Sequence, residues 1–267
     1  MRILITCVCY NNPSDLINYL ESLKKSKTIE CEIVISVVNN GNKFDVKTIN
    51  NIQKYQDVFK INIVEEFGNI GYFPGLNIGW ELHKNDIFDY IIISNIDLAV
   101  KSDFFSRLKE HYSSISRIIA PSILSIKEKK DRNPKMLARP SKKSMFKYIF
   151  LYTIPFLHHF YKKFIYPKKN KKNIAYSNNI KVYAPHGSFI IFQNINSQLK
   201  EYLSYPVFLF GEEIYIAEIA KTLKHDIVYL NDIVIIDSDH ATTSLQSEKF
   251  IRTNNLNAMK FLLSRFW

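Results

Sequence analysis

The sequence predicts an α/β protein with a mostly parallel, doubly wound central sheet and helices on both of its faces. Short apolar runs rich in β-branched residues alternate with segments whose apolar residues recur every three or four positions. This alternation of strand and helix patterns is typical of parallel sheets. Several apolar runs also stop abruptly at polar residues, as in DYIIISNID at 89–97. Because ligands of such sheets bind beyond the carboxyl ends of the strands, these polar stops mark the edge where we expect a site.

The composition indicates a globular protein with a full hydrophobic core. The 267 residues are 46% hydrophobic and 14% aromatic, which excludes an intrinsically disordered chain. Cys7, Cys9 and Cys31 lie in or beside apolar runs, which fits a reducing cytosol without a disulfide framework. The opening MRILITCVCYNN has too short an apolar core for a signal peptide or a membrane span, so we expect it to be the first strand.

The positive charge is concentrated in one segment. Residues 127–172 contain fifteen Lys and Arg but only Glu128 and Asp131 as acids, a net charge of +13. The whole chain carries +11, so the rest of it is nearly neutral. We therefore expect a single domain with a first half at 1–121, a basic insert at 127–175 and a second half at 176–267. Such an insert implies a negatively charged partner, either anionic lipid, nucleic acid or phosphate.

The strand and helix patterns follow one another in order along both halves. The strand Arg2–Cys9 is followed by a helix that begins at Pro13, with Asn12 as its N-cap. A later helix is expected to be capped by Ser102. The other expected strands are 32–38, 59–64, 90–93, 118–121, 180–192 (interrupted by PHGS at 185–188), 227–230 and 233–236, and the other expected helices are 46–54, one from Pro74, 211–224 and one around 256–262.

Glycine is scarce, and four of the seven glycines fall within a span of twelve residues. The usual share is roughly 7%, so each remaining glycine is expected to meet a backbone need. In NIGYFPGLNIGW, Pro74 suits a helix start, and Gly75 and Gly79 share one face of that helix. This face allows either close approach of a ligand or only tight packing on the sheet. The helix N-terminus that follows Asn69 and Gly71 is a natural anion site.

These motifs together resemble those of the inverting family 2 glycosyltransferases of GT-A fold, especially the rhamnosyltransferase-like bacterial branch. TCVCYNN resembles the opening strand of that family, and VVNNGN resembles its nucleoside-binding Val-Asp-Asn segment. NIGYFPGLNIG matches the motif Asn-x-Gly-(Phe/Tyr)-x-x-Gly-x-Asn-x-Gly at every fixed position, and SNID is similar to the metal-binding DxD motif in an Asn-x-Asp form. PHGSFIIF, FLFGEEIYIAEIA and DHATTS resemble the acceptor-side strand, the segment of the catalytic base and a late His-x-x-x-Ser element.

The resemblance implies transfer of a sugar from a UDP- or dTDP-sugar, with the first half of the chain binding the nucleotide-sugar and the last half the acceptor. Mg²⁺ or Mn²⁺ would bridge the diphosphate, with Asp97 as first ligand and His240 as a late one. Glu213 would be the general base, and Glu212 could orient the acceptor instead. The donor-binding residues implied are Tyr10, Asn11, Asn39, Asn40, Asn69, Gly71, Asn77 and Asn95, and the acceptor-side residues are His186, Gly187 and Ser188.

Several alternatives stay open. Asn and Asp are common in turns, glutamates suit any helix start, and Asp237 or Asp239 could replace His240 as metal ligand. Asn39 and Glu213 stand where the family prefers Asp, which leaves room for a weakened or non-catalytic homologue. A nucleic-acid-binding protein is disfavoured because the charge sits in one segment, so no nucleic-acid partner is expected. A nucleotidyltransferase is disfavoured because CYNNPSD lacks glycine and lysine.

The basic insert also contains the apolar segment MFKYIFLYTIPFL at 145–157. It is too short to span a bilayer core of about 30 Å, but aromatics beside lysines suit the headgroup region of an anionic leaflet. The resemblance adds that many relatives extend lipid-linked glycans, such as O-antigen or capsule, at the cytoplasmic membrane. We therefore expect a cytoplasmic protein held peripherally on the inner face of that membrane, with a lipid-linked acceptor. The alternative is a basic helix pair, packed on the domain and solvated outside.

Overall fold

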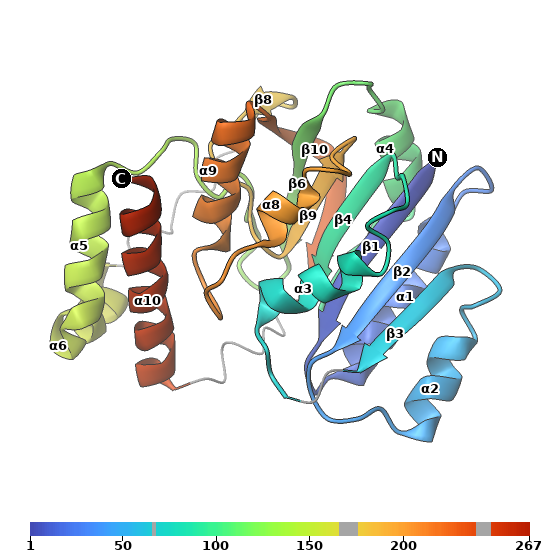
Figure 1. Ribbon diagram of the computed structural model, residues 1–267, viewed down its shortest axis with the longest axis horizontal. Helices are drawn as coiled ribbons and strands as arrows, with labels where there is room; N and C mark the ends of the chain where they lie inside the picture. The colour runs from blue at the N-terminus through green and yellow to red at the C-terminus, as the bar shows by residue number, and fades with distance from the viewer. Residues whose placement is uncertain (66–67, 166–175, 239–246) are drawn as a thin grey trace.

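The computed structural model describes residues 1–65, 68–165, 176–238 and 247–267 (Figure 1). These residues form one sheet in the order β3-β2-β1-β4-β9-β6-β10-β5, with β7 beside β6 and β8 beside β10. The strands are β1 (Arg2–Cys9), β2 (Glu32–Asn39), β3 (Lys60–Glu65), β4 (Tyr90–Asn95), β5 (Leu98–Val100), β6 (Arg117–Ser125), β7 (Lys130–Asp131), β8 (Ile180–Lys181), β9 (Phe189–Gln193) and β10 (Asp226–Asp237). The predicted α/β class is confirmed.

The strands β3, β2, β1 and β4 form a parallel block. Ile5 of β1 pairs with Ile35 of β2 on one side and with Ile92 of β4 on the other, and β2 is parallel with β3. The carboxyl ends of these strands therefore meet at one edge, where the chain turns polar at Asn39 and Asn95. The polar stops seen in the sequence lie together for this reason.

The second block of the sheet mixes strand directions. β9 is antiparallel to both β4 and β6, whereas β6 and β10 are parallel. The antiparallel pairing places PHGS, just before β9, beside the carboxyl end of β4. β10 is one continuous strand where the sequence predicted two. A register shift between Leu230 and Val234 accommodates the polar residues there without ending the strand.

Helices cover both faces of the sheet (Figure 1). They are α1 (Pro13–Ser26), α2 (Val46–Gln53), α3 (Tyr72–Glu81), α4 (Phe104–Glu110), α5 (Lys142–Thr153), α6 (Pro155–Phe160), α8 (Leu199–Leu203), α9 (Glu212–Leu223) and α10 (Glu248–Phe266), with a π-helical turn at 161–165. One core joins α1, α2 and α4 to one face of the sheet, and a second joins α3, α8, α9 and α10 to the other. The alternation along β1 feeds both cores, since Ile3 and Ile5 belong to the first and Leu4 to the second.

Two helix starts and one helix cap differ from the prediction. α1 begins at Pro13 as predicted, but the Asn12 side chain bonds Asp15 and Ser14 and does not cap a backbone N–H. α4 begins after Asp103, one residue later than a cap at Ser102 would give. α3 begins at Tyr72, two residues before the predicted Pro74, because proline is tolerated throughout the first helical turn, where N–H groups have no helical partner.

The glycine face of α3 packs tightly on the sheet. A Cβ at Gly75 would lie 2.8 Å from Val8 Cγ2, and one at Gly79 would lie 3.2 Å from Val38 Cγ2. Of the two explanations offered for these glycines, close packing of helix on sheet is therefore the one that the structure supports. This packing brings the N-terminus of α3 to the carboxyl edge of β1 and β2.

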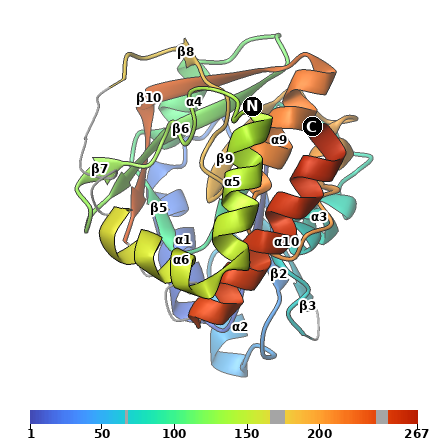
Figure 2. The same cartoon turned by 90° about the vertical axis from the view of Figure 1, so that its left-hand side faces the viewer.

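Residues 142–165 of the basic insert fold into α5, α6 and the π-helical turn, which stand with α10 at one end of the molecule (Figure 2). α5 buries Met145, and the partly buried Tyr148, Ile149 and Tyr152 belong to the same core as α10. Within the residues described, none of the helices combines the length and the hydrophobicity that crossing a bilayer requires.

Candidate active site

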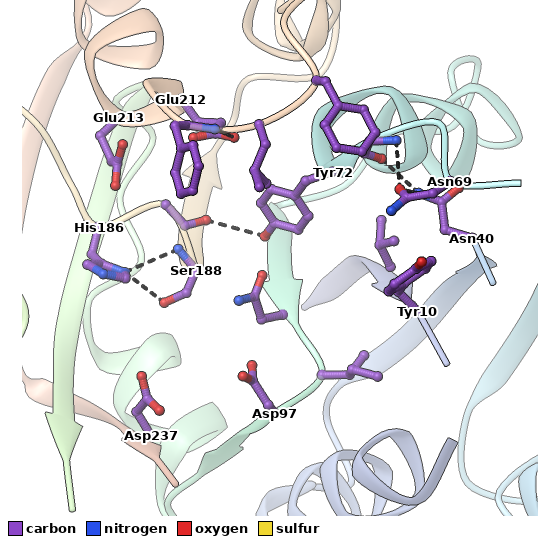
Figure 3. A pocket seen from close by; sticks show the side chains of 18 of the residues that line it. Tyr10, Asn40, Asn69, Tyr72, Asp97, His186, Ser188, Glu212, Glu213 and Asp237 are labelled. Atoms are coloured by element: carbon purple, nitrogen blue, oxygen red, sulfur yellow. Dashed lines mark hydrogen bonds between the residues drawn. The ribbon is translucent and has the colours of Figure 1, made fainter. Parts of the chain in front are cut away.

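A cleft of about 380 Å³ opens at the carboxyl edge of β1 and β4 (Figure 3). Eleven of the predicted site residues line it: Tyr10, Asn40, Asn69, Gly71, Asn95, Asp97, His186, Gly187, Ser188, Glu212 and Glu213. Figure 3 shows Tyr10, Asn40 and Asn69 at one end and His186, Glu212 and Glu213 at the other, with Asp97 and Asp237 along one side. Segments up to two hundred residues apart in the sequence therefore converge on one cavity.

The end around Asn40 and Asn69 is held rigidly by the turn that begins α3. Asn40 is 1% exposed, and its Nδ2 donates to Gly71 O at 2.8 Å. Asn69 Oδ1 accepts from Gly71 N at 3.1 Å. Because a carbonyl oxygen only accepts, the first bond fixes the orientation of the Asn40 amide, and its Oδ1 has no partner in the described part of the chain. A buried acceptor at the wall of the cleft suits a ribose hydroxyl or a base N–H.

Gly71 adopts a backbone conformation in this turn that residues with a side chain rarely adopt. Its φ is 99°, in the region that favours glycine, and a Cβ there would lie 2.8 Å from the carbonyl oxygen of Phe208. Phe208 also lines the cleft. The glycine therefore lets the chain turn into α3 while the segment before α9 closes over it.

Three predicted donor-binding residues do not line the cleft. Asn39 accepts from Gly41 N at 3.2 Å and donates to Asn42 O at 2.8 Å, while Asn11 Oδ1 accepts from Asn42 N at 2.8 Å. Both side chains thus hold the loop after β2. Asn77 lies within α3, and its buried Oδ1 finds no partner among the residues described.

Asp97 lies between β4 and β5, where burial works against its ionised form. Burial, then the negative charge of Asp237 and, less strongly, that of Asp15 raise the pKa of Asp97 to about 6. Asp237 ends β10, is 4% exposed, and its Oδ2 lies 2.9 Å from Nη1 of Arg132. Figure 3 shows the Asp97 and Asp237 side chains next to each other on the same side of the cleft.

This pair of carboxylates fits a hard divalent cation. Two acids that disfavour each other's charge would both be stabilised by Mg²⁺ or Mn²⁺, which prefer oxygen ligands. Within the described ranges, no group of three or more His, Cys, Asp or Glu is arranged to hold a metal ion. The predicted ligand His240 and its alternative Asp239 lie outside the described residues.

The start of α9 brings two glutamates to the other end of the cleft. Glu212 is 7% exposed, and its Oε1 accepts from Phe210 N at 2.8 Å. Burial and then the charge of Glu213 raise the pKa of Glu212 to about 8, so Glu212 holds a proton at neutral pH. Glu213 Oε1 lies 3.5 Å from Nζ of Lys135. Glu213, which is less buried than Glu212 and lies beside Lys135, is the better placed of the two to act as a base.

The predicted acceptor-side residues form a turn between these carboxylates. Gly187 O accepts from Tyr72 Oη at 3.3 Å, and Ser188 O accepts from Asn95 N at 2.8 Å. His186 Nδ1 contacts Ser188 Oγ at 2.8 Å. The turn is thus fastened to α3 on one side and to the end of β4 on the other.

Some residues that line the cleft were missed by the sequence reasoning. Tyr72 lies in the glycine-rich motif and Phe208 begins the segment FLFGEEIYIAEIA, but both were taken only as motif positions, and Phe250 gave no signal. Arg132 and Lys135 belong to the basic insert, whose charge was assigned to an outside partner. Their pairing with Asp237 and Glu213, from distant parts of the chain, could not be read from spacing.

The family model for glycosyl transferase family 2 matches residues 5–193, more than two thirds of the chain. The chain belongs to glycosyl transferase family 2. Its matched region includes Tyr10, the glycine-rich turn, Asp97 and the 186–188 turn. A search of curated proteins finds no match to this family 2 glycosyltransferase.

Solved structures are similar to this glycosyltransferase in fold. S. aureus TarS 1–349 is 14% identical, with a TM-score of 0.55 over 98% of this chain and 71% of that one. GalNAc-T7 with UDP, GalNAc and Mn²⁺ is 12% identical, with a TM-score of 0.60 over 89% of this chain and 44% of that one. The likeness extends over nearly the whole chain, and the GT-A fold is confirmed.

Proposed function

We propose that this family 2 glycosyltransferase moves a sugar from a UDP- or dTDP-sugar to a hydroxyl group of a glycan acceptor, with inversion. The observation that carries this proposal is the division of the cleft, with the amides of Asn40 and Asn69 at one end and the carboxyl groups of Glu212 and Glu213 at the other. S. aureus TarS has been solved in complex with UDP-GlcNAc, and GalNAc-T7 with UDP and Mn²⁺, which supports a nucleotide-sugar donor here.

The residues divide the reaction between them. Tyr10, Asn40 and Asn69 hold the nucleoside, so that the sugar points toward α9. Glu213 takes the proton of the acceptor hydroxyl while the acceptor oxygen bonds to the anomeric carbon. The bond from that carbon to the diphosphate breaks, and the diphosphate leaves with the electron pair. A single displacement with one base on the acceptor side inverts the anomeric centre.

Charge on the diphosphate has to be neutralised as it leaves. Mg²⁺ or Mn²⁺ held at Asp97 would supply that neutralisation. Asp237 is near enough to raise the pKa of Asp97, and we infer that it supports the same site. Asn95 contributes no charge, so diphosphate oxygens and water would complete the coordination.

Replacing Glu213 with Gln tests the assignment of the base. We expect turnover to fall by roughly 10²–10⁴-fold, because the proton has no acceptor, with unchanged donor affinity. Purified protein is incubated with UDP-, dTDP- and GDP-sugars and Mn²⁺, and donor loss and thermal shift are measured. Glu212→Gln is the matched control and should keep most activity, since Glu212 is protonated at neutral pH. The opposite result would assign the base to Glu212. A wild-type protein that binds donors without turnover would indicate a non-catalytic homologue.

We further propose that the acceptor is a lipid-linked glycan of a bacterial surface polysaccharide such as O-antigen or capsule, as in the rhamnosyltransferase-like branch. Support comes from the outer face of α5, α6 and the π-helical turn. Five phenylalanines on these elements are between 46% and 75% exposed: Phe146, Phe150, Phe156, Phe160 and Phe164. Lysines 142, 143, 147 and 163 accompany them, and residues 142–165 contain no acid. Aromatics mixed with lysines suit the headgroup region of an anionic leaflet.

On this proposal the protein is cytoplasmic and binds the inner face of the cytoplasmic membrane peripherally. Each basic residue near an anionic surface is worth about 1 kcal/mol, so a few of these lysines suffice for binding. The triple change Phe146→Ser, Phe150→Ser and Phe156→Ser should reduce sedimentation with phosphatidylglycerol vesicles. Ile29→Ser removes an exposed apolar side chain elsewhere and is the control. A wild-type protein that stays in the supernatant at low salt contradicts membrane binding.

A further inference from the structure

A hydrogen-bond donor with a fixed orientation lies at the acceptor end of the cleft, on the ring of His186. Its Nδ1 lies 3.3 Å from the backbone N of Ser188 and 2.8 Å from Ser188 Oγ (Figure 3). A backbone N–H can only donate, so Nδ1 carries a lone pair. In the neutral ring the proton therefore resides on Nε2.

The surroundings keep this ring neutral. Burial lowers the pKa of His186 well below its usual value, and the cations Lys135, Arg132 and Lys130 lower it further. Each of these cations has its own carboxylate partner, which is Glu213, Asp237 and Glu128 respectively. The ring is thus a neutral donor among paired charges and not part of a site for an anion.

The backbone that carries the ring is held in place. His186 N donates to Asn133 Oδ1 at 2.7 Å, and Asn133, which is 1% exposed, donates its Nδ2 to Pro121 O at 2.8 Å. Tyr72 also donates to Gly187 O, and Asn95 N donates to Ser188 O. These bonds hold the turn at 186–188, and the turn sets the direction of the His186 ring. Nε2 has no hydrogen-bond partner within the residues described, although His186 lines the cleft.

The base of the proposed reaction lies close to the turn that carries the His186 ring. A Cβ at Gly187 would lie 3.6 Å from Glu213 Cγ and 3.7 Å from Glu213 Oε1, so the Glu213 side chain packs over the residue that follows His186. Figure 3 shows the His186 and Glu213 side chains at the same end of the cleft, so one sugar there can reach both.

We propose that His186 determines acceptor specificity by donating Nε2–H to a second hydroxyl oxygen of the acceptor sugar, near the hydroxyl that Glu213 deprotonates. The inference rests on the proposed function, because it takes Glu213 as the base. A hydroxyl suits the site better than a carboxylate or phosphate, since the nearby cations are already paired. An acceptor without this hydroxyl leaves a desolvated donor unpaired, and sites built in this way discriminate strongly against such analogues.

Nitrogen NMR of the full chain, labelled with ¹⁵N-histidine, tests the state of the ring directly. Long-range ¹H–¹⁵N spectra, with the His186 signal assigned from the His186→Gln variant, should show the Nε2–H tautomer. The signal should not titrate between about pH 5 and about pH 8, where a free histidine would. Ser188→Ala keeps the backbone N–H that faces Nδ1 and should keep the tautomer. An Nδ1–H tautomer, or a protonated ring at neutral pH, overturns the proposal.

Methyl glycosides of glucose, galactose, rhamnose and N-acetylglucosamine, with their deoxy analogues, serve as acceptor probes in the presence of UDP and Mn²⁺. One glycoside should shift the Nε2 signal, and its analogue lacking one hydroxyl should not. His186→Phe keeps a ring without the N–H, and should lower transfer to that glycoside about tenfold or more without changing UDP binding. No shift with any glycoside, or equal transfer by His186→Phe, refutes the proposal. Wild-type turnover by Glu213→Gln would instead refute the assigned base and leave the NMR result standing.

Discussion

The buried carboxyl of Glu212 should make the stability of this protein fall as the pH rises, and Glu212→Gln should remove that dependence. In the unfolded chain the carboxyl has its ordinary pKa of 4.5, whereas in the fold its pKa is about 8. Below the lower value both states are protonated, and folding carries no penalty. Between the two values the unfolded chain releases its proton while the folded protein keeps it, so stability declines with pH. Above about 8 the decline ends.

The size of the effect follows from these two pKa values. A difference from 4.5 to about 8 corresponds to on the order of 5 kcal/mol in the free energy of unfolding. This is an upper limit, because Glu213 can move toward Lys135 and water can enter the cleft when Glu212 ionises. We expect about 2 kcal/mol or more to be measurable, since each tenfold change in proton affinity is worth about 1.4 kcal/mol.

Urea unfolding at a series of pH values measures the difference between Glu212→Gln and wild type. The glutamine keeps an oxygen for the Phe210 N–H but has no proton to lose. The variant should gain stability relative to wild type from about pH 5 to about pH 8. Glu201→Gln changes an exposed carboxyl and should show a constant difference. A constant difference for Glu212→Gln as well would refute the reasoning.

Three further substitutions test other parts of the structure. Asp97→Asn should abolish the thermal stabilisation given by Mn²⁺ with UDP while leaving the ligand-free protein at least as stable as wild type, because burial and Asp237 raise the pKa of Asp97; a wild-type response to Mn²⁺ would exclude Asp97 as a ligand. Arg139→Met leaves Glu218, 4% exposed and bonded to Arg139 at 2.7 and 2.9 Å, without its cation, and should lower the free energy of unfolding by about 2 to 3 kcal/mol in urea. Gly79→Ala should destabilise by about 1 to 3 kcal/mol, because the Cβ would clash with Thr6 Oγ1 and would also meet Val38 at 3.2 Å and Ser36 at 3.3 Å. A more stable Gly79→Ala, the usual effect within a helix, would show that α3 can move off the sheet.

The fold was predictable because local patterns agree with the final packing. β1 matches the predicted Arg2–Cys9, and α1 begins at the predicted Pro13. The predictions that differ from the structure concern residues whose tertiary contacts outweigh their local conformational preference. β10 runs through a polar interruption because β6 pairs with it on both sides of the register shift. The side chain of Asn12 turns to Asp15 and Ser14, so a residue type that favours caps does not cap here.

The site was predictable where a motif fixes the backbone, and less so where only a residue type was known. Asn69 and Gly71 lie where the glycine-rich motif requires a turn, and Asp97 and Glu213 follow or begin regular elements. Asn39 is bonded within its own loop, which no spacing pattern reveals. The pairing of Lys135 with Glu213 depends on tertiary contacts between distant segments.

The first turn of α10 ties the outer helices to the cleft within a few residues. Glu248 pairs with His158 and His159 of α6, and Arg252 donates to Tyr152 O of α5 at 2.8 Å. Phe250, between them in sequence, lines the cleft. A shift of α5 and α6 would therefore be transmitted through the first turn of α10 to Phe250 at the cleft. On the proposed membrane-bound arrangement, the distance from the surface that holds α5 and α6 to the cleft would depend on this one helical turn.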